Sequence, residues 1–215
     1  MIIKFYQEKI IRRIINSNYF YFDDFERNII YEDCKEFFNR EEAEEILFEQ
    51  IKKYLKKKRN IVLDGIVNFR IDEYIKYLDN IVDMAVNKYI IEKEYKEFIS
   101  LLKLYVNTTE YKTDIIHLIY IHGESILLDK DKKIVQIDGN LANTKYLSDI
   151  SFSSNDIALN TLLSMLPKKI EMHIIDSEDE FISTLKLIFE NRVSICQDCN
   201  ICRTYKMLQT TAFNK

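Results

Sequence analysis

The hydrophobic pattern of this chain changes its period once, near residue 110, and that change restricts the possible folds more than any other feature. Before residue 110, apolar residues recur at the three- and four-residue spacing of amphipathic helices. After it, apolar and polar residues alternate, as they do in half-buried strands. We therefore predict an α+β fold, with an N-terminal helical bundle packed with a C-terminal mixed β-sheet.

Three segments follow from this division: a helical region at residues 1–110, a mixed α/β region at 111–202 and a C-terminal tail at 203–215. The stretch "NTTEYKT" (107–113) is polar enough for a junction but too short for a free tether. We therefore expect the helical and mixed regions to pack together.

The best-marked helix of the first region is predicted from Asn39 to about Arg59. Asn39 can cap it, and the Glu42 side chain could bond back to the backbone N–H of the cap. Two earlier helices are expected at 4–15 and 23–38. A further helical block, 68–107, would be capped by Asn68, and because forty residues far exceed the usual helix length we expect a break near 89–92.

The second region is predicted to follow the order βββαβαβ. Its expected elements are a hairpin at 114–129 turning at Gly123, a third strand at 133–140, a helix at 153–166 with a serine cap, a strand at 169–175, a helix at 177–189 with a Ser177/Glu180 capping box, and a strand at 192–196. A right-handed crossover would make the last two strands parallel and could place them side by side.

Composition indicates a globular, soluble protein, with 47% hydrophobic and 31% charged residues among 215. A net charge of −4 argues against a dedicated nucleic-acid binder, whose affinity depends on neutralising phosphates. The basic run Lys52–Arg59 could contact nucleic acid, anionic lipid or an acidic partner, but it is explained more simply as the solvated end of a helix.

The apolar runs are too short to cross a membrane, since a spanning helix needs about 20 residues. The N-terminus "MIIKFYQEKIIRR" has no small-residue cleavage site, so we expect no signal peptide. The expected location is the cytoplasm, where clustered cysteines are more often ligands or redox groups than structural disulfides.

The main candidate site is a C-x2-C-x2-C motif formed by Cys196, Cys199 and Cys202. Thiolates at this spacing can face one zinc ion, but a closed tetrahedral site needs a fourth ligand. We favour His173, because it lies near the C-terminal end of a strand expected to run parallel to the one ending at Cys196. The weaker alternatives for this ligand are Cys34, His117, His122 and a cysteine of a second subunit.

Three other interpretations of the motif remain open. An iron–sulfur cluster would require a further thiolate. A thioredoxin-type pair could exchange disulfides, with a short helix opening at "RTYKML". The three residues could also simply complete the fold as small, partly buried side chains.

No catalytic signature accompanies the cysteines. The three glycines are too far apart for a phosphate-binding loop, and neither H-E-x-x-H nor G-x-S-x-G occurs. A lone histidine such as His117, inside an apolar strand, is typical of a satisfied core residue. The catalytic and cofactor-binding sets predicted from the sequence are therefore empty.

Three stretches resemble the YtxC-like sporulation proteins of endospore-forming bacteria: the long helical block 67–106, "IIHLIY" (115–120) and "FISTLKLIFENRVSICQDCNIC" (181–202). The likeness runs over most of residues 10–202. It implies a cytoplasmic protein associated with spore formation, without an assigned activity or catalytic residue. We also expect this chain to lack an N-terminal segment that other members carry.

Taken together, the sequence favours a non-enzymatic binding or scaffold protein with an unidentified protein partner. The alternative is a metal-binding protein, with zinc or an iron–sulfur cluster, or a thiol-redox protein. In the metal-binding case the ligands would be Cys196, Cys199, Cys202 and His173.

Overall fold

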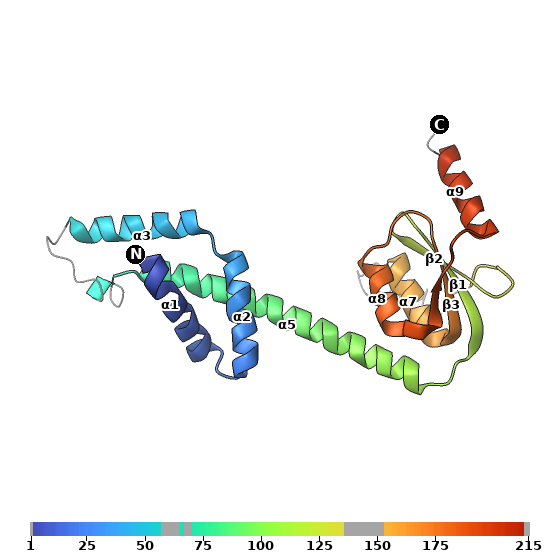
Figure 1. Cartoon of the computed structure of the whole chain (residues 1–215), viewed down its shortest axis with the longest axis horizontal. Helices are drawn as coiled ribbons and strands as arrows, with labels where there is room; N and C mark the ends of the chain where they lie inside the picture. The colour runs from blue at the N-terminus through green and yellow to red at the C-terminus, as the bar shows by residue number, and fades with distance from the viewer. Residues whose placement is uncertain (1, 57–64, 67–69, 136–152, 213–215) are drawn as a thin grey trace, which may run out of the picture. The chain divides into compact units, whose positions relative to one another are not determined.

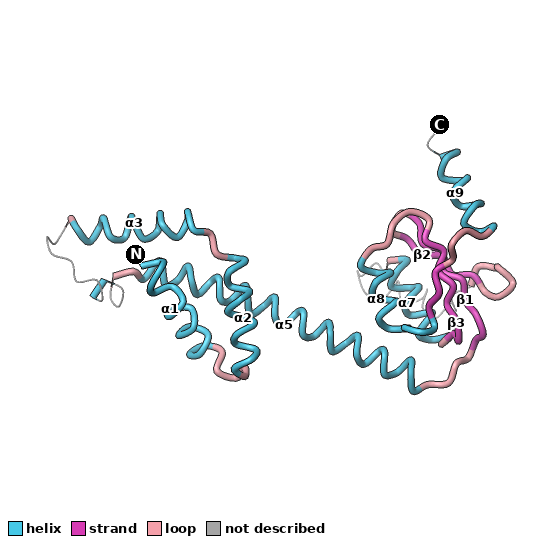
Figure 2. The backbone as a smooth tube through the Cα atoms, in the orientation of Figure 1, coloured by secondary structure: helices cyan, strands magenta, loops and turns pink. Residues whose placement is uncertain are grey.

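The computed structural model describes residues 2–56, 65–66, 70–135 and 153–212. By packing, the chain divides into two compact units, Met1–Lys96 and Glu97–Lys215. The first unit is helical and the second combines helices with a sheet (Figure 2). This arrangement of helices followed by a mixed sheet is the predicted α+β fold.

The first unit contains α1 (Ile2–Asn18), α2 (Asp24–Phe37), α3 (Arg40–Leu55) and the first part of α5 (Asp72–Thr108). These four helices surround one apolar core (Figure 1). Its fully buried side chains include Ile15, Ile30, Tyr74 and Leu78. The repeating apolar stripes of the sequence therefore face one another in this core, as an amphipathic bundle requires.

The start of α3 bears out one predicted cap and corrects its details. The Asn39 side chain accepts hydrogen bonds from the backbone N–H groups of Glu41 and Glu42. The backbone N–H of Asn39 does not need the Glu42 carboxylate, because it donates to the Tyr77 hydroxyl at 3.0 Å. The helix ends at Leu55 rather than near Arg59; residues 57–64, like the expected cap Asn68, lie outside the described residues.

The predicted break near residues 89–92 is wrong, because α5 is one helix of 37 residues. Side chains on both sides of the expected break bind α2. Lys88 Nζ lies 2.8 Å from Asp33 and 2.7 Å from Glu36, and Lys93 Nζ lies 2.7 Å from Glu26. These contacts favour a continuous helix over this stretch, where no glycine or proline interrupts it.

The second unit is built on a four-stranded sheet in the order β2-β1-β3-β4. The strands are β1 (Thr113–Ile121), β2 (Glu124–Leu128), β3 (Pro167–Ile174) and β4 (Val193–Ile195). β1 and β2 form the predicted hairpin, whose turn residues His122 and Gly123 have φ of 52° and 76°. β3 pairs in parallel with β1 and with β4, so the two predicted parallel strands are neighbours.

The expected third strand at 133–140 is not a full strand in the described part of the chain. Ile134 forms only an isolated bridge with Leu128, and residues 136–140 lie outside the described residues. Helix α7 (Ser154–Met165) has the predicted serine cap, with Ser153 and Asp156 completing a capping box.

Helix α8 (Glu180–Phe189) is capped by Asp179, so the predicted Ser177/Glu180 capping box is wrong. Asp179 Oδ1 accepts from the backbone N–H of Ile182, while its second carboxylate oxygen accepts from the Tyr120 hydroxyl on β1. The short 3₁₀ segment η2 (Glu190–Arg192) then leads into β4. This bond to the sheet favours Asp179 over Ser177 as the cap.

The two faces of the sheet are covered differently. One face packs on α7, α8 and the end of α5 through residues such as Leu118, Met172 and Leu185. The other face carries Ile119, Leu128 and Ile175, which pack with the start of α9 (Asn200–Ala212). This second face holds the candidate site.

Within the part of the chain that the structure describes, no helix combines the length and apolar character needed to cross a bilayer.

Candidate metal centre

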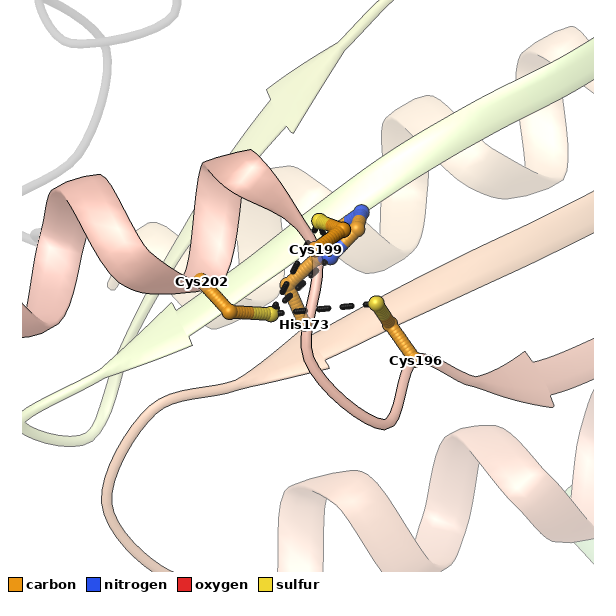
Figure 3. A group of neighbouring side chains, drawn as sticks. All are labelled: His173, Cys196, Cys199 and Cys202. Atoms are coloured by element: carbon orange, nitrogen blue, oxygen red, sulfur yellow. Dashed lines mark hydrogen bonds between the residues drawn. The ribbon is translucent and has the colours of Figure 1, made fainter.

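Four side chains from three separate segments converge on one point of the sheet (Figure 3). His173 lies near the end of β3, Cys196 directly follows β4, and Cys199 and Cys202 lie at the start of α9. The parallel pairing of β3 with β4 causes this approach, since the Cys196 backbone N–H continues the ladder by donating to Met172 O at 2.9 Å. The structure thus brings together all four side chains predicted as metal ligands.

The ligand atoms all lie within 4.8 Å of one another, and four of their six separations are close to those around a single tetrahedral ion. His173 Nδ1 lies 3.4 Å from both Cys199 Sγ and Cys202 Sγ. Cys202 Sγ is 3.9 Å from Cys199 Sγ and 3.8 Å from Cys196 Sγ. Zinc bond lengths of about 2.3 Å to sulfur and about 2.0–2.1 Å to nitrogen place tetrahedral ligands about 3.8 Å apart for two sulfurs and about 3.6 Å apart for sulfur and nitrogen.

The same separations bear on the other interpretations of the cysteines. All three thiols are free, and the distances from Cys202 Sγ to the other two sulfurs are well beyond the length of about 2.05 Å of a disulfide bond. In a four-iron cluster each thiolate binds a different iron, which requires sulfurs further apart than on a single ion. The geometry therefore fits one ion better than a cluster or a formed disulfide.

The surroundings of the site are largely apolar. His173 is 1% exposed and Cys202 is 2% exposed, whereas Cys196 and Cys199 are partly buried. Apolar neighbours on the sheet and on α9 surround the sulfurs, namely Ile119, Leu128, Ile175, Ile201 and Tyr205. A dry environment of this kind strengthens the attraction between thiolates and a cation.

Cys199 occupies the residue immediately before α9, where a thiolate is favoured. Its carbonyl accepts the first bond of the helix, from Arg203 N at 3.0 Å. Burial alone would raise the pKa of the Cys199 thiol, but hydrogen bonds from the backbone N–H groups of Cys202 and Ile201 and from the neighbouring thiols outweigh it and lower that pKa. A thiolate at a helix N-terminus is the form of cysteine that binds metals.

Two of the other ligands, Cys196 and His173, are neutral in the absence of an ion. Burial, with a smaller contribution from the adjacent thiols, raises the pKa of Cys196. Burial first, and then the proximity of His117, lower the pKa of His173. His173 therefore presents an uncharged imidazole, which is the form that coordinates a metal.

His117 contacts the opposite side of the His173 ring. Its Nδ1 lies 3.0 Å from His173 Nε2, the ring centroids are 5.3 Å apart, and Glu171 Oε2 lies 3.6 Å from the same Nδ1. The expectation of a satisfied core histidine fits this position, but the bond to a candidate ligand was not predicted. The strand register could have indicated it, because β1 and β3 pair His117 with Glu171 and Ile119 with His173.

The remaining alternatives for a fourth ligand lie elsewhere. Cys34 is fully buried in the core of the first unit, where burial raises the pKa of its thiol. His122 lies in the hairpin turn, where its Nδ1 is 3.3 Å from Asp176. The basic run Lys52–Arg59 is a separate candidate. Within it, Lys52 pairs with Glu49 at 2.9 Å and Lys53 with Glu73 at 3.8 Å, and residues 57–59 of the run lie outside the described part.

Comparison with known proteins gives a family and one curated relative. The family model described as "YtxC-like family" matches residues 1–194. The "Uncharacterized protein YtxC" of Bacillus subtilis (strain 168) is 22% identical over 169 residues, which cover 72% of this chain and 59% of that protein. No solved structure matches the chain.

The family match includes His117, Glu171 and His173 but ends two residues before Cys196. The three cysteines of the candidate metal centre thus lie outside the matched region, which covers nearly the whole of the remaining chain. On that match, the chain belongs to the YtxC-like family.

Proposed function

We propose that this protein binds one zinc ion through Cys196, Cys199, Cys202 and His173, and that the ion has a structural role. The observation that carries the proposal is the agreement between the sulfur–sulfur and sulfur–nitrogen separations and those of a tetrahedral Cys₃His site. Zinc fits this ligand set better than magnesium or calcium, which prefer oxygen ligands.

A structural role follows from the number of ligands. A catalytic zinc site keeps one position for water or substrate, whereas four protein ligands fill a tetrahedral shell. The ion would join the end of β3 to the residue after β4 and to the first turn of α9. It would thereby hold the C-terminal helix against the sheet.

This role agrees with the non-enzymatic binding or scaffold function predicted from the sequence. In this proposal the zinc centre stabilises a platform, and a protein partner binds that platform. The association with spore formation, which the family resemblance implies, is part of the same proposal.

Zinc content of the purified protein tests the proposal. Protein prepared without chelator should contain one zinc per chain, and Cys199→Ala should reduce the content to well below one. Cys34→Ala is the matched control: it also removes a thiol, but one in the core of the first unit, so it should leave the zinc content at one. Both variants need circular dichroism to show that they are folded.

The thiol-redox alternative predicts a different result. The purified protein would then contain no zinc, and mild peroxide would reduce its count of free thiols by two, a loss that a dithiol reductant reverses. This result would contradict the zinc proposal and favour a reversible disulfide. Zinc-free protein with no reactive thiol pair would leave the cysteines as fold-completing residues only.

A further inference from the structure

The second ring nitrogen of His173 has a defined partner. Nε2 lies 3.0 Å from His117 Nδ1, a distance typical of a hydrogen bond. His173 is 1% exposed and His117 is 8% exposed, so solvent has little access to either ring. His117 is therefore placed to determine which nitrogen of His173 carries the proton.

The chemistry of the imidazole makes that choice important for a metal. A neutral ring has one protonated nitrogen and one with a free lone pair. Because Nδ1 faces Cys199 and Cys202, binding an ion there requires the proton to be on Nε2. A buried N–H without an acceptor would cost about 1–3 kcal/mol, and His117 Nδ1 is the acceptor at hydrogen-bond distance.

We propose that His117 is a positioning residue for the metal ligand His173: it accepts the Nε2–H and so holds the tautomer and ring orientation that present Nδ1 to the cysteines. This inference rests on the proposed zinc site. It adds a residue outside the coordination shell that sets the affinity of the site.

The sheet holds His117 in this position. His117 is directly opposite Glu171 in the parallel pairing of β1 and β3, which puts it on the same face as His173. The two rings lie at 27° to each other. Glu171 Oε2, at 3.6 Å from His117 Nδ1, is too far for a hydrogen bond, which leaves that nitrogen to accept from His173.

The same three residues, His117, Glu171 and His173, could also be considered as ligands of a second ion. Two arguments favour the hydrogen bond. Nitrogen ligands of one tetrahedral zinc are about 3.3 Å apart, and the observed 3.0 Å is shorter. Moreover, a second ion on Nε2 would require His173 to lose its remaining ring proton. We therefore expect one ion per chain.

Two variants of similar shape test the role of His117 in the full-length protein. His117→Asn keeps an acceptor, since Asn Oδ1 lies where His Nδ1 lies, whereas His117→Leu has none. Zinc affinity measured by competition with a chromogenic chelator should fall by about 10–100-fold in His117→Leu. In His117→Asn it should stay within a few-fold of wild type.

NMR of the ¹⁵N-labelled wild-type protein with zinc supplies a measurement that needs no variant. His173 should show the shifts of a ring bound through Nδ1 and protonated at Nε2, with a slowly exchanging Nε2–H. In folded His117→Leu this proton should exchange faster, and in His117→Asn it should stay protected. A merely structural role of His117 would not change that exchange.

The outcomes separate the two proposals. A wild-type protein that binds no zinc overturns both. Three results would overturn the positioning role and leave the zinc site intact. The first is equal zinc affinity in wild type and His117→Leu, and the second is coordination of His173 through Nε2. The third is two zinc ions per chain, one of which is lost in His117→Leu.

Discussion

At the scale of single residues, the grouping of the four candidate ligands was within reach of sequence reasoning. The spacing of Cys196, Cys199 and Cys202 suggested one ion, and the expected parallel strands suggested His173 as the fourth ligand. The contact between His117 and His173 could not be predicted, because the sequence gives neither the register of β1 against β3 nor the direction of a ring nitrogen.

Tyr77 shows another contact that the sequence does not indicate. Its hydroxyl accepts from the backbone N–H of Asn39 and donates to the carbonyl of the same residue, each at 3.0 Å. Tyr77 of α5 therefore binds both the backbone N–H and the backbone carbonyl of the cap residue, which holds the start of α3 against α5.

Removing that hydroxyl should destabilise the first unit. Tyr77→Phe loses both hydrogen bonds at about 0.5–1.5 kcal/mol each, so the free energy of unfolding should fall by about 1–3 kcal/mol. Urea unfolding followed by circular dichroism measures this change. Tyr21→Phe, which alters an exposed aromatic ring, is the control and should be near neutral; equal effects would contradict the account.

Arg192 satisfies backbone groups of the second unit. Its guanidinium donates to Val106 O near the end of α5 at 2.5 Å and to Pro167 O at the start of β3 at 3.2 Å. Without the Arg192 side chain, both partly buried carbonyls would lack this charged donor.

Arg192→Leu should therefore reduce the free energy of unfolding by about 3–6 kcal/mol, since the two hydrogen bonds come from a charged group and such bonds contribute about 1.5–3 kcal/mol each. Arg203→Leu is the matched control: Arg203 forms an ion pair with Asp198 at 3.0 Å, and with an exposed pair the loss should stay below about 1 kcal/mol. A loss for Arg203→Leu as large as for Arg192→Leu would refute this distinction.

At the scale of elements, the change of period and two of the predicted caps were confirmed, whereas the length of α5 and the cap of α8 were not. Asn39 and Ser153 cap the helices that they were expected to cap. The break in α5 was expected because long helices are uncommon, but the local sequence holds no breaker and its side chains bind α2. Asp179 replaces Ser177 as a cap because of its tertiary bond to Tyr120.

Glu26 is the centre of the contacts that join α2 to α5. Its carboxylate lies 2.7 Å from Lys93 Nζ, accepts from the Tyr89 hydroxyl at 2.9 Å and bonds back to the backbone N–H of Asp23 at 2.9 Å. The Lys93 ammonium, then the Asp23 N–H and the Tyr89 hydroxyl, lower the pKa of Glu26 from 4.5 to about 2.

This lowered pKa predicts how stability depends on pH. A carboxyl with a depressed folded-state pKa stabilises the fold above its ordinary pKa of 4.5, and that stabilisation is lost as pH falls towards 2. Glu26→Gln should therefore unfold at lower temperature than wild type at pH 7, and the two melting temperatures should converge between pH 4.5 and 2.

The control for this effect is Glu32→Gln, which changes an exposed pair with Lys35 on the same helix. Exposed pairs contribute little, so this variant should melt close to wild type at pH 7. If the difference in melting temperature between Glu26→Gln and wild type stays constant from pH 7 to pH 2, the charge of Glu26 is not the cause of the lower stability.

At the scale of the whole molecule, the sheet separates two kinds of packing. One face is covered by α7 and α8, which lie beside the sheet in Figure 1. The other face meets the start of α9 next to the four candidate ligands. The alternation along β1 and β3 predicted that each strand would have two different faces. Which segment covers each face depends on the strand order. The sequence predicted only that the two strands joined by a crossover could be neighbours.

Metal removal should act on one unit and spare the other. In hydrogen–deuterium exchange measured by mass spectrometry, a strong chelator should increase exchange in β4 and α9, which the proposed ion joins to β3. Exchange in α1, α2 and α3 should stay unchanged, because the core of the first unit contains none of the four ligands. Uniform changes in both units, or none, would contradict a local structural role of zinc.

The most direct test of the central claim is X-ray absorption at the zinc edge of the protein as purified. The proposed site should give a single zinc environment with three sulfur ligands at about 2.3 Å and one nitrogen at about 2.0–2.1 Å. A shell dominated by oxygen and nitrogen, or a protein that contains no zinc, would contradict it.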